Sequence, residues 1–378
     1  MTTRKFYHDF TPASSGTGGQ AEILLTTTEI AGAAIFEIAQ MSLSTVPFDL
    51  FLDQLLVPGD QWFRWTGPLG QIRETKTALS GLFGRFVARA YLTRYLGFSH
   101  FEPIRSDTQL LNGWPNLSVK RTKTGDLPDW VIASTVGANT VAIAEAKGSH
   151  NTAGAAAPLD AAKSQVRRVN IVAGSTVLKV KRYAIATRWA VKNAAGLDAP
   201  WLVVHDPEDG DREPNRDEQG LLVRSIALGH FASIAEGFGL RETAVALRSA
   251  KSKRPGHLQL SQREVLAVSR SGEENSTGIT AIVTPAGLIA IPRTGDLEEF
   301  RSALLTVYGE RTLVLTISAA TLYAADQIPD LAKESVPARA ADAEHLWTQQ
   351  RRYPDGSVLI PLKMAAMERI PPDQSIVT

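Results

Sequence analysis

The sequence predicts an α/β fold in which a mixed sheet is flanked by helices and followed by a further α/β region. Two observations carry this prediction. Apolar residues recur at three- and four-residue spacing through residues 71–96, the pattern of a long helix. Short apolar runs bounded by turn-forming residues then indicate three strands, a second helix and more strands. This order implies helices packed on a mixed sheet.

The expected elements of the first region are a helix over Gln71–Leu96 that stops at Gly97, strands over Phe101–Arg105, Asp129–Ser134 and Thr140–Lys147, a helix over Pro158–Val172, and strands over Tyr183–Trp189 and Trp201–His205. Val136-Gly137-Ala138-Asn139 supplies a turn between the second and third strands, which predicts a hairpin. In the second region we expect helical structure over Leu222–Ala250, a hairpin of Ile279–Val283 with Leu288–Pro292, a helix over Asp296–Tyr308, a strand over Arg311–Thr316 and a late hairpin within Tyr353–Pro361.

The chain has 378 residues, which is enough for two domains. We expect a flexible N-terminal arm at 1–20, a domain at 21–210 with its core at about 70–205, and a C-terminal α/β domain at 219–378 whose role the sequence does not indicate. The N-terminus lacks a signal-peptide core and no apolar run has the length of a membrane span, so we expect a cytoplasmic protein without a membrane partner. Cysteine is absent, which excludes disulfides and thiolate metal sites.

The net charge of +1 does not by itself indicate a nucleic-acid partner, but its distribution is uneven. Residues 161–197 contain no acid and these basic residues: Lys163, Arg167, Arg168, Lys179, Lys181, Arg182, Arg188 and Lys192. A basic face of this kind suits a phosphate backbone. A solvated helix face with basic strand ends is the alternative.

The chemistry-bearing residues lie on the predicted hairpin. Leu127-Pro128-Asp129-Trp130 opens its first strand and Glu145-Ala146-Lys147 closes its second. Side chains alternate faces along a strand, so Glu145 and Lys147 share one face, and the alanines of the other face suit a closely packed helix. The hairpin brings Asp129 beside them. Two carboxylates with water suit Mg²⁺. A surface hairpin with an incidental ion pair is the alternative interpretation.

These residues resemble the active-site motif of the PD-(D/E)xK nuclease superfamily, which has the restriction-endonuclease-like fold, over about residues 70–205. The resemblance implies that Asp129 and Glu145 hold Mg²⁺, with Mn²⁺ as a substitute, and that Lys147 orients the attacking water or offsets phosphate charge. Gln165, on the following helix, matches a glutamine that some families direct at the site, although Val169 stands where a tyrosine often follows.

One position departs from the family pattern. Arg85, in the run Gly84 to Leu92, stands where many relatives carry a glutamate. This puts a second metal site in doubt and suggests that Arg85 contacts phosphate instead. We expect Lys163, Arg167 and Arg168 to join it in binding nucleic acid.

The resemblance therefore implies a Mg²⁺-dependent nuclease that cleaves phosphodiester bonds in DNA, with restriction or defence against foreign DNA as a role by analogy. The alternative is a catalytically inactive subunit that keeps the fold to bind nucleic acid or to assemble. The sequence leaves open endonuclease against exonuclease action, DNA against RNA, the target, the need for a partner ATPase, and whether the chain forms a homodimer or binds a partner protein.

Overall fold

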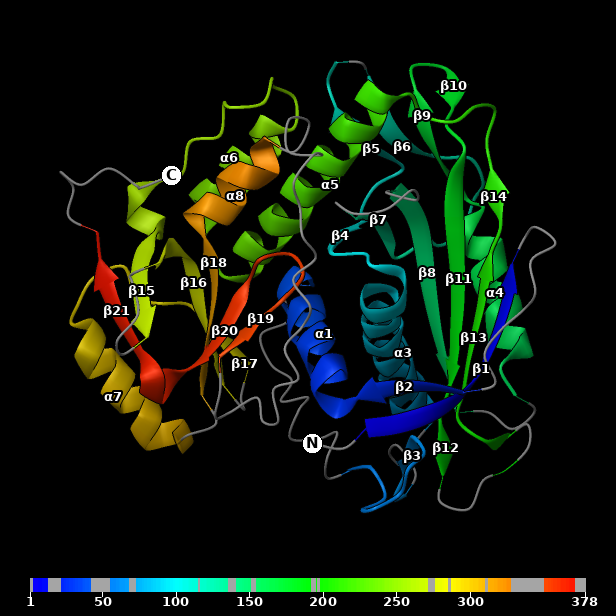
Figure 1. Ribbon diagram of the computed structural model, residues 1–378, viewed down its shortest axis with the longest axis horizontal. Coiled ribbons are helices and arrows are strands. Elements are labelled where there is room, and N and C mark those ends of the chain that lie inside the picture. The colour runs from blue at the N-terminus through cyan, green and yellow to red at the C-terminus, as the bar shows by residue number, and fades with distance from the viewer. Residues whose placement is uncertain are drawn as a thin grey trace. The chain divides into compact units, whose positions relative to one another are not determined.

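The computed structural model describes residues 3–12, 22–41, 55–67, 73–114, 116–134, 141–150, 154–191, 195, 198–270, 276–284, 287–309, 312–327 and 350–370. The chain divides into two compact units, drawn in Figure 1. The first consists of Met1–Glu37 and Phe48–Val223, and the second of Ile38–Pro47 and Arg224–Thr378. We expected the second domain to begin at residue 219, whereas the division falls inside a helix, between Val223 and Arg224.

The first unit is built on a large mixed sheet with the strand order β2-β1-β13-β11-β8-β7-β4, and β14 pairs with β11. Its strands are β1 (Thr3–Pro12), β2 (Glu22–Thr26), β4 (His100–Pro103), β7 (Trp130–Ala133), β8 (Val141–Ser149), β11 (Val180–Arg188), β13 (Trp201–Asp206) and β14 (Glu208–Asp209). Strands β4, β7 and β8 form an antiparallel meander, and β8 then pairs in parallel with β11. A mixed α/β architecture is thereby confirmed. The turn predicted at 136–139 lies outside the described residues.

Two helices cover this sheet. α3 (Arg73–Leu96) packs against β8 and β11, and α4 (Ala156–Val166) packs against β8, β11 and β13. Figure 1 shows the sheet between them. A Cβ added to Gly84 on α3 would lie 2.5 Å from the backbone nitrogen of Gly148 on β8, so the helix and strand meet backbone to backbone. The predicted close packing of a helix on the alanine face of β8 is confirmed, and Gly97, with φ of 73°, follows the end of α3 as expected.

The expected flexible arm at residues 1–20 is wrong for Thr3–Pro12. These residues form β1, which pairs in parallel with β13 and antiparallel with β2. The side chain of Phe6 is fully buried, while Lys5 and Tyr7 are only partly buried. The polar composition that suggested an arm therefore belongs to the outward side of a strand whose backbone is paired on both edges. Residues 13–20 lie outside the described part of the chain.

A smaller four-stranded sheet, of order β10-β9-β6-β5, was not expected. Its strands are β5 (Thr108–Asn112), β6 (Leu117–Arg121), β9 (Val169–Ala173) and β10 (Thr176–Val177). The helix predicted over Pro158–Val172 consequently ends early, at Val166, because the β-branched run that follows pairs with β6 instead. Further elements of this region are a short pair, β3 (Arg64–Trp65) with β12 (Ala190–Val191), and the first helix, α1 (Thr27–Gln40). Helix α1 continues into the second unit at Ile38.

The second unit has a sheet of order β19-β20-β18-β16-β15-β21, with β17 beside β16. Its strands are β15 (Leu266–Arg270), β16 (Ser276–Thr284), β17 (Gly287–Ile289), β18 (Leu313–Ser318), β19 (Arg351–Arg352), β20 (Val358–Pro361) and β21 (Ala365–Arg369). Its helices are the C-terminal part of α5 (Arg216–Gly237), α6 (Arg241–Ala250), α7 (Leu297–Tyr308) and α8 (Ala319–Asp326). The hairpin of β16 with β17 and the helix α7 are confirmed. The late hairpin forms, but its first strand, β19, lies before the predicted range of Tyr353–Pro361.

Local sequence accounts for several of these boundaries. The side chain of Asp296 accepts from the backbone N–H groups of Glu298 and Glu299 and so caps α7, which Gly309 ends at a φ of 65°.

The core of this unit also encloses an ion pair, Arg224 with Asp326, in which both side chains are almost completely buried. Among the described helices of the chain, none is long and apolar enough to cross a membrane.

Candidate active site

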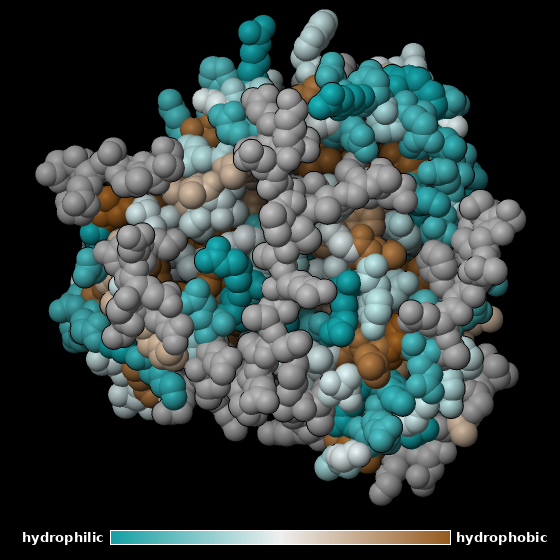
Figure 2. All heavy atoms as spheres, in the orientation of Figure 1, coloured by the Kyte–Doolittle hydropathy of each residue, from teal (hydrophilic) through white to brown (hydrophobic). Residues whose placement is uncertain are grey.

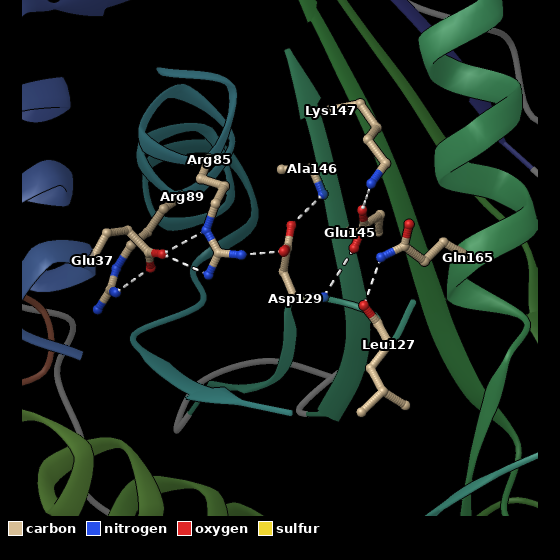
Figure 3. Close-up of polar contacts among 9 residues, drawn as sticks. All are labelled: Glu37, Arg85, Arg89, Leu127, Asp129, Glu145, Ala146, Lys147 and Gln165. Carbon is tan, nitrogen blue, oxygen red and sulfur yellow. Dashed lines mark hydrogen bonds and ion pairs between the residues drawn. The ribbon is translucent and has the colours of Figure 1, made fainter. Parts of the chain in front are cut away.

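The predicted hairpin brings Asp129, Glu145 and Lys147 together. In the β7–β8 register Trp130 pairs with Ala144, so Asp129, one residue earlier, lies next to Glu145. The backbone N–H of Asp129 donates to Glu145 Oε2 over 2.9 Å, and Lys147 Nζ lies 2.5 Å from Glu145 Oε1 (Figure 3). The expectation that these three residues converge is confirmed.

Glu145 lies in the interior of the sheet, and its side chain is about 1 % exposed. Burial, and then repulsion from Asp129, raise the pKa of Glu145 to about 8, against an opposing attraction from Lys147. The carboxyl group is therefore poised to lose or keep a proton near neutral pH. Glu145 lies in the middle of β8, which continues to Ser149 and not only to the predicted Lys147. A buried acid with a pKa shifted in this way is typical of a functional site.

Asp129 is held on both of its carboxylate oxygens. Oδ2 accepts from the backbone N–H of Ala146 over 2.9 Å, and Oδ1 forms an ion pair with Arg85 of α3. Burial raises the pKa of Asp129, and the charge of Arg85 opposes that rise without cancelling it. The neighbouring acid Glu37 adds to the rise. A buried carboxylate in this position requires nearby positive charge.

The guanidinium of Arg85 contacts two acids and an aromatic ring of the protein itself. Its Nε and Nη2 donate to Glu37 Oε2 over 3.1 and 2.9 Å, its Nη1 pairs with Asp129, and its guanidinium lies 4.6 Å from the ring centre of Trp130. Burial alone lowers the pKa of Arg85, but the charges of Asp129 and Glu37 outweigh it and raise the pKa. That Arg85 contacts phosphate stays a prediction.

Two residues of this network were not predicted. Glu37 on α1 is completely buried, and Arg89 on α3 donates from Nη1 to Glu37 Oε1 over 2.6 Å. The guanidinium of Arg89 also lies over the ring of Phe101, 4.5 Å from its centre. A signal for Glu37 exists in the sequence, because it is the single charged residue in the apolar run 30–39. A charge in such a run needs a buried partner.

The network joins three acidic and three basic side chains, and its two adjacent acids, Asp129 and Glu145, repel each other. In order across the site the side chains are Arg89, Glu37, Arg85, Asp129, Glu145 and Lys147 (Figure 3).

Gln165 lies on α4 as expected but contacts backbone. Its Nε2 donates to the carbonyl of Leu127 over 2.6 Å, and the side chain is almost fully buried. Leu127 precedes Asp129 by two residues, so Gln165 fixes the segment that delivers this carboxylate. The geometry is that of a positioning residue.

The predicted nucleic-acid-binding residues on and after α4 do not converge on the carboxylates. Lys163 lies 3.5 Å from Asp160 on the same helix, and Arg167 is exposed. Arg168 Nη1 donates to the carbonyl of Asp126 over 3.1 Å. These cations border the loop that leads to Asp129, which leaves them available as an outer electrostatic surface.

The carboxylates Asp129 and Glu145 are the oxygen ligands that the site offers to a metal ion. Among the described residues, no three His, Cys, Asp or Glu side chains form a group suited to a metal. Any ion here would depend on Asp129 and Glu145 together with non-protein ligands, which is the manner in which Mg²⁺ is commonly held.

Comparison of the chain with models of protein families finds no match, and comparisons with curated proteins and with solved structures find none either.

Proposed function

We propose that the chain is a Mg²⁺-dependent nuclease that hydrolyses phosphodiester bonds in DNA, and that its first unit has the restriction-endonuclease-like fold of the PD-(D/E)xK superfamily. Apart from the strands of the smaller sheet, which are inserted between them, the elements α3, β4, β7, β8, α4 and β11 follow in the order of helix, three strands, helix and strand expected for that core, and this supports the fold. The observation that carries the function is the convergence of Asp129, Glu145 and Lys147 on adjacent strands.

The partners of the four carboxylate oxygens indicate where a metal ion fits. Asp129 Oδ2 and Glu145 Oε2 accept from the backbone N–H groups of Ala146 and Asp129. Oδ1 and Oε1 instead face the side-chain cations Arg85 and Lys147. Side chains rotate without breaking the sheet, so Oδ1 and Oε1 are the oxygens that can be released. We assign Asp129 and Glu145 to Mg²⁺, or to Mn²⁺ in its place.

Bound Mg²⁺ supplies Lewis-acid stabilisation of charge on the scissile phosphate. Lys147, released from Glu145, is the cation that offsets charge developing on that phosphate or holds the attacking water. Gln165 keeps Asp129 in place through the carbonyl of Leu127. Arg167, with its neighbours Lys163 and Arg168, attracts the DNA backbone.

The test is cleavage of linear, circular and single-stranded DNA, with an RNA substrate in parallel, in Mg²⁺ and in Mn²⁺. Asp129→Asn and Lys147→Ala are expected to lower the rate on the order of 100-fold or more. Lys5→Ala is the control, because Lys5 is a partly exposed lysine outside the basic stretch and pairs with Glu22. Cleavage that survives both site substitutions would overturn the assignment. Cleavage of circular DNA would identify an endonuclease.

One observation favours a second function, a catalytically inactive subunit that binds nucleic acid or assembles with a partner. Arg85 already pairs with Asp129 and Lys147 with Glu145, so both carboxyl groups have side-chain partners without a metal ion. Binding of DNA without cleavage in either Mg²⁺ or Mn²⁺ would favour this function over the first.

A further inference from the structure

We propose that Arg85 is a displaceable cation: in the metal-free protein it holds Asp129, and in the working enzyme its Nη1 leaves Asp129 and binds a phosphate of the DNA. This inference rests on the proposed nuclease function, whose metal assignment it refines. It gives the arginine a substrate-binding role.

The three donor atoms of Arg85 divide into two sets. Nε and Nη2 both donate to Glu37 Oε2, whereas Nη1 alone reaches Asp129. Glu37 is completely buried and is held from its other oxygen by Arg89. The guanidinium is thus anchored by Glu37, and release of Asp129 ends only one of its three contacts. The planar guanidinium of arginine can keep the hydrogen bonds of two nitrogens while the third changes its partner, which the single ammonium of lysine cannot do.

The pair formed by Arg85 and Asp129 is the more solvent-accessible part of the site. The side chain of Arg85 is 19 % exposed and that of Asp129 is 12 % exposed, against 1 % for Glu37 and for Glu145. The ring of Trp130 lies beneath the guanidinium and limits its rotation. A phosphate that approaches Asp129 therefore comes near a guanidinium whose plane is already set by Glu37 and Trp130.

Competition for one oxygen couples the two ligands. Arg85 and a divalent cation cannot both hold Asp129 Oδ1 at contact distance, because their charges repel in a partly buried site. DNA that draws Nη1 away frees this oxygen, so DNA should strengthen metal binding, and the metal should strengthen DNA binding by the same factor.

The coupling can be measured without any turnover. Mn²⁺ is titrated into the full chain and free Mn²⁺ is followed by electron paramagnetic resonance, with and without a short phosphorothioate-linked DNA duplex that resists cleavage. We expect the duplex to tighten Mn²⁺ binding to the wild type by about fivefold or more. Asp129→Asn, with the same duplex, corrects for Mn²⁺ held by the DNA itself.

Arg85→Lys tests the residue directly. A lysine can pair with Glu37 but cannot also hold Asp129, so it is expected to bind Mn²⁺ about fivefold or more tightly than the wild type in the absence of DNA and to lose the effect of the duplex. Arg94→Lys is the matched control on the same helix, because Arg94 pairs with Glu29, an acid outside the network. It should behave as the wild type.

The outcomes separate the two proposals. Mn²⁺ binding that depends on Asp129 but is unchanged by Arg85→Lys and by the duplex would overturn the role of Arg85 and leave the nuclease proposal standing. Absence of Asp129-dependent Mn²⁺ binding in every variant would overturn both. If Arg85→Lys fails to fold, a wild-type protein whose Mn²⁺ affinity is unchanged by the duplex still overturns the role of Arg85.

Discussion

Gly148→Ala provides a strong test of how α3 is placed on the sheet. A Cβ at this position would lie 1.6 Å from the carbonyl oxygen of Ser80, where ordinary contacts begin near 3.4 Å. The helix must therefore retreat by about 1.8 Å, which also breaks the 3.3 Å hydrogen bond from Trp189 Nε1 to the same carbonyl. Overpacking costs about 1–3 kcal/mol and a lost hydrogen bond about 1 kcal/mol. We therefore expect Gly148→Ala to lower the free energy of unfolding by about 3 kcal/mol.

Urea denaturation followed by circular dichroism measures this loss, and Gly81→Ala is its matched control. Gly81 lies on the same helix, and a Cβ there would meet no atom within 4 Å, so alanine should stabilise the protein by about 0.5–1 kcal/mol. Because Arg85 moves with α3, Gly148→Ala should also weaken its contact with Asp129. A Gly148→Ala protein as stable as the wild type, or a Gly81→Ala protein equally damaged, would refute the placement.

Three further predictions concern buried polar groups. The first compares the free energy of unfolding of Glu145→Gln with that of the wild type, both in EDTA. The difference should shift in favour of the variant by roughly 2–4 kcal/mol as pH rises from about 5 to 9. The raised pKa of Glu145, about 8 against 4.5 in the unfolded chain, means that wild-type stability falls across this window while that of the variant does not; thermal melts with a pH-independent difference would contradict this. Gln165→Ala removes the hydrogen bond to the carbonyl of Leu127 and should lower the free energy of unfolding by about 1 kcal/mol. An unchanged melting temperature would count against the positioning role. Asp326→Ala leaves Arg224 charged and buried without its carboxylate, so urea denaturation should reveal a loss of about 3–5 kcal/mol, and a loss below about 1 kcal/mol would argue against the buried pair.

The elements that the sequence predicted well are those defined by local pattern. The long helix α3, strand β8 and the hairpin of β16 with β17 each follow from periodicity and turn residues. The elements that were missed depend on pairing with distant segments. Strand β1 is polar in part, and its backbone pairs with β2 on one edge and, on the other, with β13, nearly 200 residues later in the chain.

The candidate site divides in the same way. Asp129, Glu145 and Lys147 were placed together because all three lie on one hairpin, where alternation and antiparallel pairing set their positions. Glu37 and Arg89 were missed because Glu37 belongs to a separate helix, 52 residues from Arg89 along the chain. Gln165 was placed on the correct helix, but the sequence did not indicate that its amide would bind the carbonyl of Leu127.

The sequence by itself therefore determined which acids and which lysine meet, since neighbouring strands and a period of two residues decide that locally. Only the tertiary structure decided what surrounds them. The backbone contact of Gly84 with Gly148 sets how near α3 lies to β8, and so brings Arg85 onto Asp129. Helix-on-sheet packing joins segments far apart in the chain, and its outcome depends on side-chain volumes and buried charge that no local pattern specifies.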